Sequence, residues 1–151
     1  MNAIAAAAVA FNEAMGDDFD AYAAQIVTNA KALAEGLLTH DLRLVTGGTD
    51  NHLLLVDLTP RDIGGRDAAV ALEKAGIVVN SNSIPFDTRG PFDPSGIRIG
   101  TAAVTTRGMD SDDMGQIADF IGRVLDDLDD EDKLAAIGRE VEEFCADFPL
   151  P

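Results

Sequence analysis

Apolar residues recur along the chain in four stretches that predict helices. Residues 17–38, about 114–128 and 134–144 show apolar positions every three to four residues. Residues 3–11 are apolar on every side, and a helix of that kind has to be buried. We therefore expect residues 1–16 to pack against a partner or against another part of a larger structure. No basic residue precedes Lys31, which argues against a secretory signal, and the run is too short to cross a bilayer.

Four shorter runs predict strands. Residues 42–45 and 52–58 flank the turn-forming residues 46–51, a pattern that indicates an antiparallel hairpin. Residues 77–80 and 96–101 are the other two predicted strands.

A short amphipathic helix, residues 65–75, precedes the third strand and ends before Gly76. With the other helices it predicts an α+β fold, in which a small, mostly antiparallel sheet carries helices on one face. We expect residues 1–151 to form one domain.

Arg98 stands out among the polar residues. It follows a long irregular loop, residues 81–95, and such loops are commonly functional. Within its strand it alternates with Ile97 and Ile99 and so points to the opposite face of the sheet. A buried guanidinium needs a carboxylate partner. Either an acid of the chain supplies it, or the arginine is kept for a ligand carboxylate, which it would bind through two parallel hydrogen bonds.

The charge balance narrows the classes of partner. Twenty-seven acidic residues face eleven basic ones, giving a formal charge of -16. Such a field repels phosphate backbones and anionic lipids, so we expect no nucleic-acid or membrane partner. An acidic surface with few lysines suits a protein held in concentrated salt, which suggests a halophilic source. The lone Cys145 has no partner for an internal disulfide, as expected in a reducing cytoplasm.

Other candidate sites have simpler interpretations. The acidic run, residues 126–132, lacks the glycine of a looped calcium site, and we expect it to be a solvated helix boundary. Gly47, Gly48 and the triplet of residues 50–52 are expected to form the hairpin turn. The sequence therefore predicts neither a metal site nor a catalytic group of its own.

Three segments, residues 46–58, 79–85 and 95–101, closely resemble successive signatures of serine hydroxymethyltransferases. Residues 4–11 and 145–149 are similar to the same family. The resemblance implies the C-terminal small domain of a fold-type I pyridoxal-phosphate enzyme, with residues 1–16 packing on a large domain that precedes it. It also implies a cytoplasmic homodimer or homotetramer as the intact protein.

The resemblance further implies the reaction and its residues. The family interconverts serine and glycine, with pyridoxal phosphate as cofactor and tetrahydrofolate as co-substrate. Arg98 matches the arginine that binds the substrate carboxylate, and Asn82 matches the pterin contact. Gly90, Pro91 and Phe92 match a folate-binding stretch in which the family has serine where this chain has Gly90. The lysine motif that holds the cofactor is absent from this sequence, so we expect these residues alone to be inactive.

Two other functions remain open at this stage. The chain could be a free-standing metabolite-binding or regulatory module that dimerises through its first helix, or the small domain of a fold-type I aminotransferase. Residues 80–92 distinguish them, because affinity for folate favours the hydroxymethyltransferase and transamination favours the aminotransferase.

Overall fold

The computed structural model describes residues 1–150. The helices and strands follow in this order along the chain: α1 (Asn2–Glu13), α2 (Asp17–Thr39), β1 (Arg43–Leu44), β2 (Leu53–Asp57), a 3₁₀ turn (Thr59–Arg61), α3 (Gly65–Lys74), β3 (Asn80–Asn82), β4 (Gly96–Gly100), α4 (Ala102–Thr106), α5 (Asp113–Asp126) and α6 (Glu131–Ala146). The strands form one antiparallel sheet in the order β1-β2-β4-β3. The predicted α+β class is confirmed.

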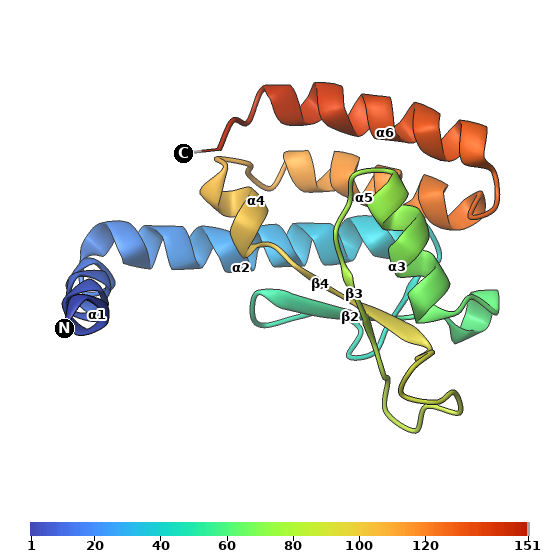
Figure 1. The fold of residues 1–151 in the computed structure, drawn as a ribbon, viewed down its shortest axis with the longest axis horizontal. Coiled ribbons are helices and arrows are strands. Elements are labelled where there is room, and N and C mark those ends of the chain that lie inside the picture. Colours follow the sequence, from blue (N-terminus) through green and yellow to red (C-terminus); the bar gives the residue numbers. More distant parts are fainter. Residues whose placement is uncertain (151) are drawn as a thin grey trace.

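The core lies between the sheet and helices α2, α3, α5 and α6, which are gathered on one side of it (Figure 1). Alternation along the strands explains this arrangement. Leu54 and Val56 of β2 and Ile97 and Ile99 of β4 are buried against the helices, while their neighbours point to the other face. We call these the inner and the outer face of the sheet. No helix among the described residues has the length and apolarity needed to span a membrane.

The α3 helix is joined closely to β4 at its first residue. The amide of Gly65 donates to the carbonyl of Pro94 at 2.7 Å. A Cβ at Gly65 would lie 2.1 Å from the carbonyl oxygen of Gly96. Only glycine allows the helix to start this near the strand, and the contact fixes the end of the loop that leads into β4.

The structure differs from the prediction at two elements. The strand expected over residues 77–80 begins three residues later, at Asn80, because only residues 80–82 run alongside β4. Helix α4 was not predicted, since its five residues carry too few apolar positions to show a helical period.

Helix α1 forms as predicted but has no buried residue. It lies at one end of the molecule, beyond the first turn of α2 (Figure 1). Its large side chains are exposed, with Ile4 at 69% and Phe11 at 71%. The expected partner surface for this helix is therefore not supplied by the rest of the chain.

Candidate functional site: an arginine on the open face of the sheet

The outer face of the sheet presents Arg98 at its centre. Arg98 pairs in register with Leu55 on β2 and with Asn80 on β3, so the three side chains share this face. Arg98 is exposed, whereas its neighbours Ile97 and Ile99 are 0% and 7% exposed. The predicted alternation is confirmed, but the guanidinium faces solvent instead of the core.

No acid within residues 1–150 neutralises Arg98. Its Nη2 atom donates to Asn80 Oδ1 at 3.4 Å, and it forms no ion pair with a carboxylate anywhere in residues 1–150. Of the two interpretations left open by the sequence, the one in which the chain supplies its own acid therefore receives no support.

Asp57 is an acid of the sheet that could compete with a ligand for Arg98. It lies on the same face, opposite Gly96 and diagonal to Arg98. Its carboxylate is instead bound by Arg43, its partner in the β1–β2 register, and by the amide and hydroxyl of Thr59 at 2.9 and 2.6 Å. Burial raises the pKa of Asp57, but these hydrogen bonds outweigh it and the net pKa is lowered. The sequence did not reveal this pair, which only the strand register brings together.

A hollow of about 560 Å³ opens beside Arg98. Residues of the hairpin turn, of β2 and of β4 lie around it, with Asn82 at the end of β3. It is lined by Thr46, Gly47, Gly48, Thr49, Asp50, Asn51, Leu53, Leu54, Leu55, Asn82 and Arg98. Asp50 reaches the hollow without pairing with Arg98 among the described ion pairs. The turn itself is held as predicted, by bonds such as Leu53 N to Asn51 Oδ1 at 2.8 Å.

Asn82 lines the same hollow as Arg98. Its Nδ2 donates to the carbonyl of Ser83 at 2.8 Å. An amide group carries two N–H donors and a carbonyl acceptor, so one N–H and the oxygen remain to meet a ligand. The structure thus brings together two of the residues that the sequence singled out.

Gly90, Pro91 and Phe92 do not line this hollow. They lie in the loop between β3 and β4, where Phe92 is 90% exposed. Phe86, in the same loop, is 99% exposed and has a positive φ of 58°. The folate contacts assigned to residues 90–92 stay a prediction.

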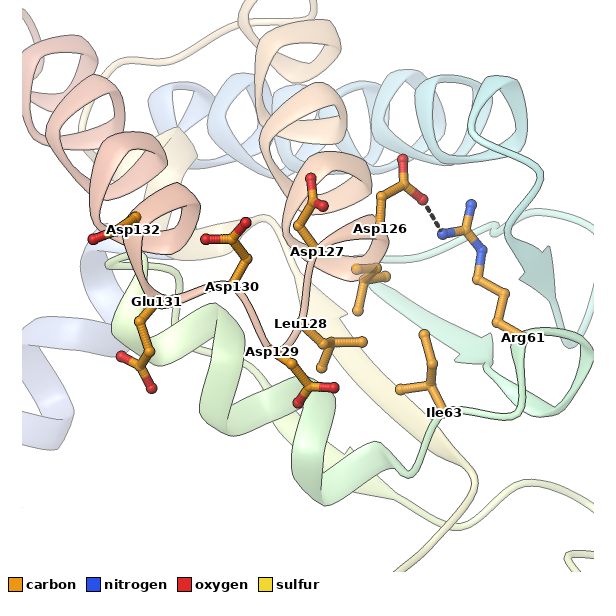
Figure 2. Close-up of a pocket in the computed structure, with 10 residues that line it drawn as sticks. Arg61, Ile63, Asp126, Asp127, Leu128, Asp129, Asp130, Glu131 and Asp132 are labelled. Carbon is orange, nitrogen blue, oxygen red and sulfur yellow. Dashed lines mark hydrogen bonds and ion pairs between the residues drawn. The ribbon is translucent and has the colours of Figure 1, made fainter.

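A second hollow, of about 790 Å³, lies over the acidic run between α5 and α6 (Figure 2). Its carboxylates point in different directions, and four of them pair with cations: Asp126 with Arg61 at 2.6 Å, Glu131 with Lys74, and Asp127 and Asp130 with Lys133. Within residues 1–150 no cluster of three or more His, Cys, Asp or Glu could hold a metal ion. The run is a helix boundary, as expected, with Asp130 capping α6 by accepting from the amide of Lys133.

The hollow beside Arg98 contains no lysine. Lys74 pairs with Glu131, Lys133 pairs with Asp127, and Lys31 is exposed on α2. A Schiff base to pyridoxal phosphate needs a lysine amine, so the lining does not fit that cofactor by itself.

Comparison with known proteins identifies the family of this chain. The family model described as serine hydroxymethyltransferase matches residues 1–121. A serine hydroxymethyltransferase of Sorangium cellulosum is 55% identical over 147 residues, which cover 97% of this chain and 35% of the relative. One from Halorubrum lacusprofundi is 52% identical over 152 residues, covering 99% of this chain and 37% of the relative. The chain thus spans little more than a third of these relatives' length. On this evidence the chain belongs to the serine hydroxymethyltransferase family.

Proposed function

We propose that this chain forms part of a glycine hydroxymethyltransferase, an enzyme that interconverts serine and glycine with tetrahydrofolate, and that it supplies the arginine for the substrate carboxylate. The observation that carries the proposal is the guanidinium of Arg98, which forms no ion pair within residues 1–150 and shares a hollow with Asn82, while the acid diagonal to it in the sheet, Asp57, is bound by Arg43. Family membership favours this function over a free-standing module or an aminotransferase.

The residues assigned to binding have separate tasks in this proposal. The planar guanidinium of Arg98 binds a carboxylate through two parallel hydrogen bonds and fixes the orientation of the amino acid. The free N–H and carbonyl of Asn82 bind the donor and acceptor edge of the pterin. Residues 90–92 extend the folate contact along the loop, where a backbone contact of Gly90 replaces the family's serine hydroxyl.

The architecture of the intact enzyme follows from the same proposal. We assign these 151 residues to the small C-terminal domain of a fold-type I enzyme, with the exposed α1 packing on the large domain. Pyridoxal phosphate, when bound, supplies the electron sink for the reaction, and we assign its binding to the remainder of the enzyme. We infer a cytoplasmic homodimer or homotetramer, and the free thiol of Cys145 suits a reducing compartment.

The test of this function is Arg98→Ala in the enzyme that contains this chain. Loss of a charge-assisted contact to the substrate costs about 1.5–3 kcal/mol, so kcat/KM for serine should fall roughly 10- to 100-fold. Arg98→Lys should recover only part of this, because an ammonium lacks the paired geometry. Arg139→Ala, on the exposed surface of α6, is the matched control. Normal serine kinetics in Arg98→Ala would contradict the proposal.

The absence of a lysine in the hollow gives a second test. The isolated chain mixed with pyridoxal phosphate should show no visible absorbance band from a lysine-linked cofactor and no turnover of serine. A clear band of that kind, located on a lysine of this chain by peptide mapping, would overturn the assignment of cofactor binding to the rest of the enzyme.

A further inference from the structure

One carboxylate in the loop between β3 and β4 accepts four hydrogen bonds. Asp87 Oδ1 accepts from the hydroxyl of Ser95 at 2.6 Å and from the amide of Arg89 at 2.9 Å. Its Oδ2 accepts from the amide of Ser95 at 2.9 Å and from the amide of Ile84 at 3.3 Å. The other acid of this loop, Asp93, contacts only the side chain of Arg89, at 3.0 Å.

These bonds join the two ends of the loop. Ile84 follows Asn82 by two residues, and Ser95 precedes Arg98 by three. Ser95 is fully buried, and its carbonyl accepts from the amide of Leu58 just beyond β2. Asp87 therefore connects the chain that leaves Asn82 to the chain that enters Arg98, at a point anchored to the centre of the sheet.

Strand β3 needs such a connection because it has little support of its own. It is three residues long, lies at the edge of the sheet and pairs only with β4. Asn80 and Ser81 are exposed. A short edge strand gains little from burial and opens easily, so the position of Asn82 depends on contacts outside the ladder.

Side-chain packing acts together with the carboxylate. A Cβ at Gly96, the register partner of Asn82, would lie 2.7 Å from Cγ2 of Ile84. The Ile84 side chain therefore lies directly over the Gly96 backbone. The amide of the same Ile84 is held by Asp87.

We propose that Asp87 is the positioning residue of the site, holding the loop closed so that the Asn82 amide and the Arg98 guanidinium keep a fixed separation. The proposal rests on the function inferred above, in which these two side chains bind the pterin and the amino-acid carboxylate.

An asparagine cannot replace this carboxylate. An amide NH₂ in the Oδ2 position would oppose the backbone N–H groups of Ile84 and Ser95, and in the Oδ1 position it would oppose that of Arg89, where only the Ser95 hydroxyl can turn to accept from it. The Ser95 and Arg89 hydrogen bonds hold the pKa of Asp87 far below its usual range, so the group stays charged near neutral pH. Asp87→Asn should therefore loosen the loop while leaving the buried core intact.

The experiment compares Asp87→Asn, Asp87→Glu and Asp93→Asn in the intact enzyme. Hydrogen exchange of the peptide that covers residues 83–95 should speed up about tenfold in Asp87→Asn. The KM for tetrahydrofolate should rise about tenfold, while kcat at saturating substrates stays within about threefold. Asp87→Glu keeps the charge and should recover part of both effects. Asp93→Asn should match the wild type in both.

Several outcomes would overturn the positioning role. Unchanged exchange in Asp87→Asn would show that the carboxylate does not hold the loop. Faster exchange with unchanged KM would show that it is only structural, and equal effects in Asp93→Asn would show that the charge of the loop matters instead. Arg98→Ala, measured alongside, tests the proposed function on its own. Impaired serine kinetics there, with unchanged KM values in Asp87→Asn, would reject the positioning role alone.

Discussion

The two faces of strand β4 place neighbouring residues in opposite environments. Ile97 and Ile99 pack among the buried side chains of the core, whereas Arg98 between them lies exposed beside a hollow. The inner face holds the sheet to the helices, and the outer face is not covered by any of them (Figure 1). In the proposed function a single strand serves both stability and binding, and the two-residue period of its side chains separates the two roles.

The inner face should give the largest effect on stability. Ile97→Ala removes a fully buried side chain and leaves a cavity, which costs about 2–5 kcal/mol. Arg98→Ala, one residue away on the exposed face, should change the free energy of unfolding by no more than about 0.5 kcal/mol. Urea unfolding of the chain measures both. Similar losses of unfolding free energy in the two variants would show that the two faces do not differ in their contribution to stability.

The close contact of α3 with β4 predicts the next largest effect. A methyl group at Gly65 would collide with the carbonyl oxygens of Gly96 and Pro94. Gly65→Ala should therefore destabilise the fold by about 1–3 kcal/mol. Gly115→Ala is the matched control, since a Cβ there meets nothing within 4 Å. That substitution, at an exposed position of α5, should stabilise by about 0.4–1 kcal/mol. Equal midpoints of thermal unfolding for the two variants would show that the contact between α3 and β4 does not exclude a side chain at residue 65.

The inner face was largely predictable from the sequence, and the outer face only in part. The period of apolar residues located the long helices and placed Arg98 opposite Ile97 and Ile99, because local alternation alone determines which face a side chain takes. The start of β3 was missed, since pairing with β4 and not local propensity decides where that strand begins.

The contacts that arrange the outer face and its loop could not be predicted in the same way. The ion pair between Asp57 and Arg43 depends on the register of β1 and β2. The four bonds to Asp87 depend on the path of an irregular loop. Neither leaves a periodic signal. The resemblance to the family singled out Arg98 and Asn82 as candidates but gave no reason why no acid among residues 1–150 pairs with the arginine.

Salt should stabilise the fold and at the same time weaken substrate binding on the outer face. The chain carries a formal charge of -16, and molar salt screens the mutual repulsion of its acids. The unfolding midpoint should therefore rise between dilute buffer and molar salt, which is the behaviour expected of a halophilic protein. The same screening weakens the attraction of Arg98 for a carboxylate, so the KM of the intact enzyme for serine should increase. A midpoint that does not rise with salt would reject the halophilic interpretation.

Asp57 should give the smallest effect, visible in the pH dependence of stability. Its folded-state pKa lies below the ordinary value of 3.8, so its contribution is complete above that value and is lost as the pH falls through the folded pKa. Asp57→Asn should destabilise by about 1 kcal/mol at pH 7, because Arg43 and Thr59 lose a charged acceptor. It should also flatten the loss of stability below pH 3.8. The exposed Asp50→Asn is the control and should leave the loss of stability at acid pH unchanged.

Asp57→Asn also removes the charged partner of Arg43, which lies on the same outer face as Arg98. An unchanged KM for serine in this variant would show that Arg98 alone determines carboxylate binding there.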